Sequence, residues 1–443
     1  MAFNLEIPMT IRPEDTVIPT LGAAAQPSPL LARGWGKEAA SFVNEAARVR
    51  YQVEIGTDHD RPEDVSFEKA GARERIFFRP EEVRAAIVTC GGVSPGLNNV
   101  IRSVVIELWH NYDVRDVSGI RYGYQGLNPA VGRPPMRLTP EMVEEIDDMG
   151  GTMIGTSRGV QEPRLMADYL ERERINLLFC VGGEGTQLGA LELYKECAQR
   201  KLPIAIVGIP KTIDNDLPFV SETFGFQTAI QASSVILEGA HCEARSAPNG
   251  IGLVKLMGRY AGFIACGATL ASQQVNFCLI PEVPFVMEGP NGFYEVLRKR
   301  LLAREHAVIV VAEGAGQDLM AGTDARDASG NVRLGDIGLF LRDEIRGYFK
   351  KEGIRAELKY IDPSYTIRST PANARDSAFC LLLGQSAVHA GMAGRTNMVV
   401  GFWKSEFTHL PIAMAVSERK QIDPRGALWS SVVASTGQPR EMQ

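Results

Sequence analysis

The chain has 443 residues, of which 45% are hydrophobic and 23% are charged, and its formal net charge is −6. This composition is that of a globular protein whose length allows a large core and two domains. The small negative charge gives no reason to expect nucleic-acid binding, and no apolar run approaches the roughly 20 residues that span a bilayer.

Seven cysteines are present, with no Cys-x-x-Cys pair and no Cys/His spacing typical of a metal site. Most of them lie in apolar runs, and an odd number of buried thiols favours a reducing cytoplasm over a disulfide framework. The first 14 residues lack a basic region followed by an apolar stretch. We therefore expect no secretory signal and a cytoplasmic location.

Residues 1–80 are predicted to form an N-terminal extension, because they hold many of the prolines and show little periodicity. A disordered tail is the alternative. Apolar residues such as Trp35 and Phe42 are too frequent for a fully solvated segment. We expect part of the extension to lie against the core or a neighbouring subunit.

A predicted strand at 85–90 runs into the turn Gly91-Gly-Val-Ser-Pro-Gly96, and a helix is expected over 98–112. This order lets backbone N–H groups approach a phosphate at a helix N-terminus, although a plain tight turn explains such glycines more often. A second glycine-rich loop, 150–159, places Arg158 beside Gly159. Its guanidinium could reach a phosphate, and a surface arginine is the alternative.

The next predicted strand, 175–181, leads into Gly182-Gly-Glu-Gly-Thr186 and a helix over 188–200. This turn contains the carboxylate of Glu184 and the hydroxyl of Thr186. Mg²⁺ prefers oxygen ligands and is usually held by one or two carboxylates together with substrate phosphates.

An apolar run at 204–207 precedes the segment Gly208-Ile-Pro-Lys-Thr-Ile-Asp-Asn-Asp-Leu-Pro218. Two carboxylates, Asp214 and Asp216, stand beside Lys211 and Thr212 in this segment. Open α/β sheets bind ligands at the carboxyl ends of their strands, whereas a lone Asp-Asn-Asp is more often a solvated polar turn. Three successive units of strand, polar turn and helix argue for a doubly wound α/β domain.

A second α/β set begins near residue 226. Helices are expected over 227–245, 293–304, 336–351 and 373–392, and strands over 250–257, 276–280, 306–312, 357–361 and 397–402. The polar stretch 318–336 is predicted to be a surface loop. The loops of this set add Arg259, Glu282, Tyr365 and Arg368. One set of loops could hold a polyphosphate with a metal and the other an anionic acceptor, which suits phosphoryl transfer.

Six motifs resemble those of the 6-phosphofructokinase family, in the family's order and over about residues 85–440. They are Gly91-Gly-Val-Ser-Pro-Gly96, Gly182-Gly-Glu-Gly-Thr186, Pro210-Lys-Thr-Ile-Asp-Asn-Asp216, Met257-Gly-Arg259, Pro281-Glu282 and Tyr360-Ile-Asp-Pro-Ser-Tyr-Thr-Ile-Arg368. The last motif and the long N-terminal extension most resemble the plant and trypanosomatid branch. The resemblance implies two Rossmann-like α/β domains with mainly parallel sheets. An ATP-binding domain would comprise 81–225 plus about 369–412, and a fructose-6-phosphate domain 226–368 plus about 413–443.

The activity that the resemblance implies is phosphoryl transfer from ATP to the 1-hydroxyl of fructose 6-phosphate, giving fructose 1,6-bisphosphate and ADP in glycolysis. Asp214 would be the general base, and Arg158, Lys211 and Arg259 would complete the catalytic set, with Arg158 offsetting charge on the transferring group. The implied donor contacts are Gly92, Arg158, Gly159, Gly183, Glu184, Gly185 and Thr186. The implied sugar contacts are Thr212, Ile213, Asp214, Met257, Gly258, Arg259, Glu282, Tyr365, Thr366, Ile367 and Arg368. The resemblance also implies an allosteric homodimer or homotetramer that uses Mg²⁺ and binds neither nucleic acid nor membranes.

Gly185 and Lys211 bear on the choice of donor. In the family, Gly at this position leaves room for the nucleotide, whereas Asp blocks it and accompanies pyrophosphate use. Lys211 is typical of pyrophosphate enzymes, but ATP-using members of the plant and trypanosomatid branch combine the same Gly and Lys. ATP is therefore favoured, with a pyrophosphate-dependent enzyme as the alternative.

The chain departs from the family at Glu184, where Asp is usual. The added methylene can move a metal ligand by about 1 Å, so a water could stand between Mg²⁺ and Glu184. A non-catalytic, ligand-sensing subunit is a further alternative, although every other implied position is intact. The Gly-Gly-Glu-Gly-Thr turn alone is also similar to lipid and NAD kinases, but the other five motifs speak against them.

Overall fold

The computed structural model describes residues 11–36, 42–53, 65–159, 161–322, 325–326 and 332–443. Parts of the predicted N-terminal extension (1–10, 37–41 and 54–64) and of the predicted surface loop lie outside these ranges. The chain forms two compact units. The first unit comprises 1–212, 217–225 and 370–418, and the second comprises 213–216, 226–369 and 419–443.

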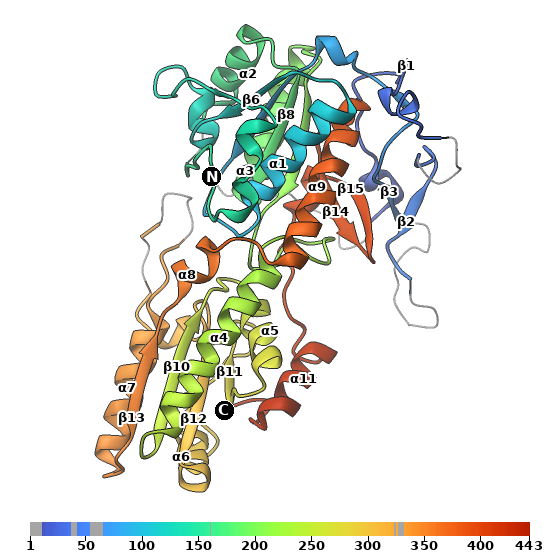
Figure 1. The fold of residues 1–443 in the computed structure, drawn as a ribbon. Coiled ribbons are helices and arrows are strands. Elements are labelled where there is room, and N and C mark those ends of the chain that lie inside the picture. Colours follow the sequence, from blue (N-terminus) through green and yellow to red (C-terminus); the bar gives the residue numbers. More distant parts are fainter. Residues whose placement is uncertain (1–10, 37–41, 54–64, 160, 323–324, 327–331) are drawn as a thin grey trace. The chain divides into compact units, whose positions relative to one another are not determined.

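A nine-stranded sheet forms the centre of the first unit (Figure 1). Its five central strands are mutually parallel, whereas the strands added at both edges pair antiparallel. In spatial order the strands are β2 (Arg48–Arg50), β3 (Ser66–Lys69), β15 (Glu406–Pro411), β14 (Met398–Trp403), β9 (Ala205–Pro210), β8 (Leu177–Gly182), β5 (Arg84–Thr89), β6 (Asp116–Ile120) and β7 (Met136–Arg137). A separate two-stranded sheet pairs β1 (Gln26–Pro27) with β4 (Arg75–Ile76).

Helices cover both faces of this sheet because successive strand residues point to opposite sides. Ile87 packs with α1 (Leu97–Ile106) and α9 (Ala374–Met392), which lie side by side on one face. Val88, the next residue, belongs to the core of the other face, formed with α2 (Pro163–Arg172), α3 (Glu184–Gln199) and α10 (Ile412–Ala415). The first unit is therefore a doubly wound, three-layer α/β structure.

The order of the central strands locates the binding edge of the first unit. Numbered along the chain, β5, β6, β8, β9 and β14 lie in the spatial order 2-1-3-4-5. The direction of winding reverses between β5 and β8, and doubly wound sheets bind ligands at the carboxyl ends of the strands at such a switch point. The two predicted glycine turns, which follow β5 and β8, both lie at this point.

Part of the N-terminal extension packs in the core of the first unit, as its apolar residues indicated. Phe67 on β3 is fully buried, and so are Leu30 and Ile76. Strand β3 pairs with β15 and extends the large sheet at its edge. This edge pairing buries backbone groups that a disordered tail would leave to solvent.

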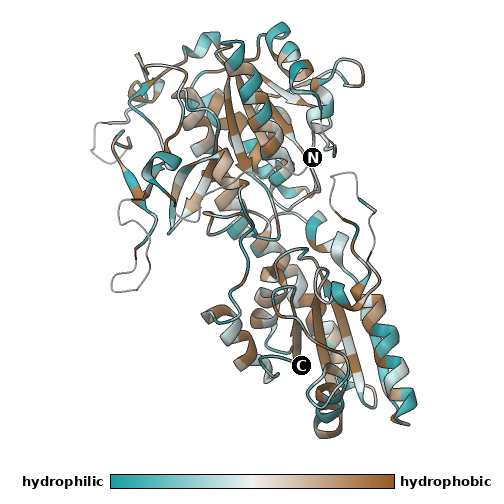
Figure 2. Ribbon diagram, turned by 180° about the vertical axis from the view of Figure 1, so that it is seen from behind, coloured by the Kyte–Doolittle hydropathy of each residue, from teal (hydrophilic) through white to brown (hydrophobic). Residues whose placement is uncertain are grey.

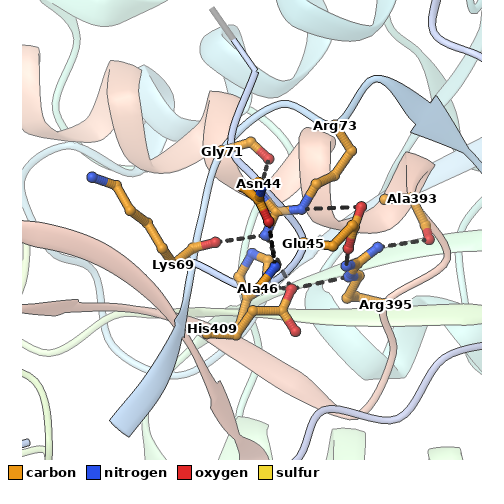
Figure 3. Close-up of polar contacts among 10 residues, drawn as sticks. Asn44, Glu45, Ala46, Lys69, Gly71, Arg73, Ala393, Arg395 and His409 are labelled. Carbon is orange, nitrogen blue, oxygen red and sulfur yellow. Dashed lines mark hydrogen bonds and ion pairs between the residues drawn. The ribbon is translucent and has the colours of Figure 1, made fainter. Parts of the chain in front are cut away.

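A buried ionic network joins Glu45, Glu68 and Arg73 of the extension to Arg395, which precedes β14, and to His409 on β15 (Figure 3). Glu68 on β3 forms ion pairs of 3.1 Å with both Arg73 and Arg395, and its Oε1 lies 3.0 Å from Nδ1 of His409. Glu45 also pairs with Arg395. The Arg73 side chain is only 1% exposed and that of Arg395 only 8%, so these charges depend on one another for compensation.

Glu68 is held ionised in this network. Burial alone raises its pKa, but His409, Arg395 and Arg73 bring the pKa down to about 2. Burial lowers the pKa of His409, so the ring is neutral at pH 7 and donates a hydrogen bond from Nδ1 to the carboxylate. The two guanidinium groups therefore supply the compensating charge.

Replacing Glu68 with glutamine is expected to cost about 3 kcal/mol, because it leaves two buried arginines with one partly exposed carboxylate. Denaturant unfolding measures this cost. The difference from the unaltered protein should be full above pH 4.5 and shrink as the pH falls toward 2, where Glu68 is itself protonated. Glu406→Gln, which breaks an exposed ion pair with Lys69, is the control and should cost at most about 1 kcal/mol.

The second unit has a four-stranded, all-parallel sheet in the order β11 (Phe277–Leu279), β12 (His306–Ala312), β10 (Gly250–Leu256) and β13 (Glu357–Ile361). One face packs against α4 (Phe226–Arg245), α5 (Phe263–Ser272), α8 (Ser364–Ser369) and α11 (Ala427–Thr436). The other face packs against α6 (Phe293–Arg304) and α7 (Ile337–Lys351). The strands are largely hydrophobic, whereas α7 carries many hydrophilic residues (Figure 2), as expected for a sheet covered on both faces.

The predicted α/β class with two Rossmann-like units is confirmed, and most element boundaries agree within a few residues. Two helices differ in extent. The helix expected to end at Tyr112 is α-helical only to Ile106 and continues as a π-helical segment, Glu107–Asn111. The helix expected from Leu188 already begins at Glu184, so the glycine turn runs directly into it. Within the described part of the chain, none of the helices combines the length and apolar character needed to cross a bilayer.

Candidate active site

The glycine turn after β5 is tied to the loop that carries Arg158. The N–H of Gly91 donates to the carbonyl of Ser157 at 2.9 Å, and Oγ1 of Thr156 donates to the carbonyl of Gly91 at 2.7 Å. Arg158 and Gly159 follow directly and are exposed. The structure thus brings these two predicted donor residues to the carboxyl end of β5.

The turn after β8 forms the beginning of α3. A Cβ atom at Gly182 would collide with the hydroxyl of Thr186, so this tight turn requires glycine. Gly183 is the N-cap residue, Glu184 and Gly185 form the first turn, and Thr186 is buried. The first N–H groups of a helix have no partner within the helix and favour anions, which makes this end of α3 suitable for a phosphate.

Lys211 connects the two glycine turns. Its Nζ donates to the carbonyl of Gly92, and its backbone N–H donates to the carbonyl of Gly182 at 3.0 Å. The side chain is buried, and it lies near enough to Gly91 that a Cβ there would be 3.3 Å from Nζ. A cation is therefore fixed at the switch point of the sheet, where polyphosphate charge would need compensation.

Asp214 and Asp216 belong to the second unit, together with Ile213. Asn215 between them adopts a left-handed backbone conformation with φ of 55°, which asparagine tolerates better than most residues. Asp216 forms an ion pair of 3.3 Å with Arg419, and the backbone N–H of Lys420 donates to its carbonyl at 2.8 Å. The C-terminal segment thus holds the carboxylate turn.

The Asp214 carboxyl has a pKa raised to about 8. Burial is the largest cause, and the negative charges of Asp216 and Glu313 add to it, while the backbone N–H of Arg259 and the charge of Arg419 oppose it. A carboxyl group with a pKa near the operating pH is suited to general acid–base chemistry.

The turn after β10 brings Arg259 to Asp214. Gly258 has φ of 130°, and a Cβ there would lie 2.6 Å from the carbonyl oxygen of Ala261, so this turn also requires glycine. The Arg259 guanidinium donates to the carbonyl of Val332. Nearby, burial raises the pKa of Glu313, which follows β12, although Arg259 is among the cations that lower it.

Glu282, which follows β11, accepts three hydrogen bonds from two backbone N–H groups. Its Oε1 and Oε2 accept from the N–H of Gly262 at 3.0 and 3.1 Å, and Oε1 accepts from the N–H of Ile422 at 3.0 Å. Burial raises its pKa despite these hydrogen bonds. Arg419 also lies 3.8 Å over the ring of Tyr260. Residues 419–422 therefore border both the Asp214–Asp216 turn and Glu282, because Arg419 pairs with Asp216 and Ile422 donates to Glu282.

The segment after β13 forms the short helix α8. Tyr365 is 75% exposed, and the Arg368 guanidinium lies 4.8 Å from the centroid of its ring. Thr366 is exposed, but Ile367 is fully buried in the core of the second unit. Ile213 is buried in the same core and Met257 packs against it, so these apolar residues position the loops through packing.

Comparison with known proteins identifies the family of this chain. The family model described as phosphofructokinase matches residues 84–391. An ATP-dependent 6-phosphofructokinase of Borreliella burgdorferi is 50% identical over 437 residues, which is 97% of this chain and 98% of that protein. The chain belongs to the phosphofructokinase family.

Two further phosphofructokinases are similar to this chain, one in sequence and one in fold. A chloroplastic ATP-dependent 6-phosphofructokinase of Arabidopsis thaliana is 47% identical over 371 residues, covering 84% of this chain and 69% of its own. The crystal structure of a pyrophosphate-dependent phosphofructokinase from Marinobacter aquaeolei matches with a TM-score of 0.66 and 19% identity, over 80% of this chain and 91% of that one. The latter likeness concerns the fold alone.

The site residues suggested by the phosphofructokinase resemblance divide between the two units. Gly92, Arg158, Gly159, Gly183, Glu184, Gly185, Thr186, Lys211 and Thr212 lie in the first unit. Ile213, Asp214, Met257, Gly258, Arg259, Glu282, Tyr365, Thr366, Ile367 and Arg368 lie in the second. Sequence reasoning did not single out Glu313 or Arg419, whose charges act on Asp214, or Lys255, which pairs with Asp336 and Asp362. Glu313 directly follows a predicted strand, so the strand-end rule that found Glu282 could have found it.

Proposed function

We propose that the protein transfers the terminal phosphoryl group of ATP to the 1-hydroxyl of fructose 6-phosphate and releases fructose 1,6-bisphosphate and ADP. Its membership of the phosphofructokinase family and the names of the relatives support this reaction. The observation that carries it is the position of Asp214, whose Oδ1 is shielded from solvent and which has Asp216 and the backbone N–H of Arg259 as neighbours. It lies three residues along the chain from the lysine that joins the phosphate-binding turns.

In this proposal the second unit holds the sugar. Asp214 accepts the proton of the 1-hydroxyl as that oxygen attacks the phosphoryl group. Arg259 and Arg368 are cations suited to the sugar phosphate, and Glu282 can accept hydrogen bonds from sugar hydroxyls. Tyr365 is exposed beside Arg368, where it could contact the same phosphate.

The first unit holds the donor in this proposal. The glycine turns and the N-terminus of α3 accept the phosphate chain, and Lys211 and Arg158 offset its charge. Gly185 is exposed, and a Cβ atom there would meet nothing within 4 Å. This open space is compatible with a donor as large as a nucleotide.

Magnesium is part of the proposal. Among the residues that the structure describes, no group of three or more His, Cys, Asp or Glu side chains could hold a metal ion. Glu184 offers one carboxylate in the first turn of α3, and Mg²⁺ in kinases takes one or two carboxylates together with substrate phosphates. Glu184 therefore fits as a ligand, directly or through a water, and the bound ion would supply charge neutralisation.

Assays with each donor separately test the reaction. We expect Mg²⁺-dependent formation of fructose 1,6-bisphosphate with ATP and little or none with pyrophosphate. If the protein were active with pyrophosphate but not with ATP, it would be the pyrophosphate-dependent enzyme and the proposal of ATP as donor would be wrong. Binding of fructose 6-phosphate without turnover by either donor would instead support a non-catalytic, ligand-sensing subunit.

The pH dependence of kcat/KM for fructose 6-phosphate is expected to show an acid limb near pH 8. This parameter reports groups of the free enzyme, and Asp214 must lose its proton to act as a base. The sugar phosphate also ionises, with a pKa of about 6. Titrating fructose 6-phosphate alone distinguishes this ionisation from that of Asp214. The rate should rise about tenfold per pH unit below the pKa and level off above it.

Asp216→Asn sharpens this prediction. Removing the charge of Asp216 takes away one cause of the raised pKa of Asp214, so the acid limb should move to lower pH. Asp343→Asn, which alters an exposed ion pair on α7, is the control and should leave the limb in place. An unmoved limb in Asp216→Asn would contradict the assignment of Asp214 as the titrating base.

We also propose that the enzyme is a cytoplasmic homodimer or homotetramer. All seven cysteines are free thiols, which supports a reducing compartment. Size-exclusion chromatography with light scattering tests the oligomeric state, and a monomer with full activity would contradict a sugar site completed by a neighbouring subunit.

A further inference from the structure

Lys255 is a buried cation between two carboxylates of the second unit. It is the second-to-last residue of β10, and its side chain is 11% exposed. Its Nζ lies 3.0 Å from Oδ2 of Asp336 and 2.9 Å from Oδ2 of Asp362. Burial lowers the pKa of Lys255, but the two carboxylates raise it by more than burial lowers it. The pKa is therefore raised overall, and the amine is charged.

Each carboxylate uses its other oxygen to hold the start of a helix. Oδ1 of Asp336 accepts from the N–H groups of Gly338 and Leu339, each at 3.1 Å, as the N-cap of α7. Oδ1 of Asp362 accepts from the N–H and the hydroxyl of Ser364, at 3.1 and 2.5 Å. Ser364 is the first residue of α8. One ammonium group therefore connects the end of β10 with the beginnings of two helices.

The two structures joined in this way both carry proposed sugar contacts. Residues 257–259 follow Lys255 along the chain, and α8 carries Tyr365 and Arg368. Because α8 has only six residues, its own hydrogen bonds fix its direction weakly. The position of α8 relative to the end of β10 then depends on the packing of Ile367 in the core and on Asp362 with the cation that it contacts.

We propose that Lys255 is a positioning residue for the sugar-phosphate site, which acts by holding the Asp362 turn and α8 against the end of β10. This inference rests on the proposed function. Lys255 does not need to contact substrate in this role. Its loss would also leave Asp336 and Asp362 without the shared cation, so that their charges repel and the start of α8 moves.

Lys255→Met tests the proposal, since methionine keeps much of the length and removes the charge. We expect KM for fructose 6-phosphate to rise about tenfold or more, with kcat and KM for the donor changed less than about threefold. A fall in kcat at unchanged KM for the sugar, or equal changes in the KM of both substrates, would overturn the proposal.

Asp362→Asn is the second variant, because it keeps an acceptor for Ser364 while removing the ion pair with Lys255. It should raise KM for the sugar in the same way. In the double variant the two effects should not add, since both remove the same contact. Additive effects would mean that Lys255 and Asp362 act separately and would contradict the proposal. If Lys255→Met failed to fold, Asp362→Asn alone would still test it, and an unchanged KM for the sugar in that variant would overturn it.

Lys359→Met is the matched control. Lys359 lies on the neighbouring strand β13, and its exposed side chain pairs with Glu243 at 3.4 Å. Its removal should leave both KM values unchanged. If the unaltered protein turned over fructose 6-phosphate but Lys255→Met kept its KM, only the positioning role would fail. If the unaltered protein showed no turnover with either donor, the proposed function would fail first.

Discussion

Asp214→Ser is expected to lower kcat by about 10²–10⁴-fold, which is the usual contribution of a positioned general base. The serine hydroxyl cannot accept a proton at the pH of the reaction. Binding of fructose 6-phosphate should remain measurable by calorimetry, because the other proposed sugar contacts are retained. The variant therefore separates the chemical step from binding.

Asp214→Asn complements the serine variant. The amide has nearly the size of the carboxyl, and its oxygen can still accept from the backbone N–H of Arg259 that contacts Asp214. The loss of kcat should be of the same order as in Asp214→Ser, whereas Asp343→Ser on α7 should be close to normal. Near-normal turnover in either Asp214 variant would show that another group removes the proton.

Gly185→Asp is expected to lower kcat/KM for ATP by about 10²–10³-fold. A carboxylate in the first turn of α3 would meet the phosphates of the donor, and like charges brought together cost several kcal/mol, each 1.4 kcal/mol being a factor of ten. The substitution should not disturb the fold, because Gly185 is exposed and a Cβ there meets no neighbour within 4 Å. The melting temperature should therefore remain near that of the unaltered protein.

Gly185→Ala is the matched control, since it adds a Cβ without charge and should keep most of the activity with ATP. Pyrophosphate is assayed in parallel with both variants. If Gly185→Asp used ATP as well as the unaltered protein, this position would lie away from the donor. In that case the choice between ATP and pyrophosphate would have to rest on Lys211 or on residues outside the two glycine turns.

Local patterns in the sequence were enough to predict the elements around the donor turns. Apolar runs of strand length, glycines and helical periodicity act over a few residues, so the units built on β5, β8 and β9 were expected close to their observed bounds. The same patterns predicted a doubly wound α/β domain followed by a second α/β set, whereas the two Rossmann-like domains were implied by the resemblance to the phosphofructokinase family. They also placed Glu184, Lys211, Asp214 and Glu282 at strand ends.

Contacts between distant parts of the chain were decided only by the tertiary structure. Lys255 meets Asp336 and Asp362, and Arg419 meets Asp216, across separations of about 80 to 200 residues. The raised pKa of Asp214 has the same origin, because burial and the charge of Glu313 come from folding. A buried charge is costly unless a partner arrives from elsewhere in the chain, and no local pattern of residues encodes which partner that is.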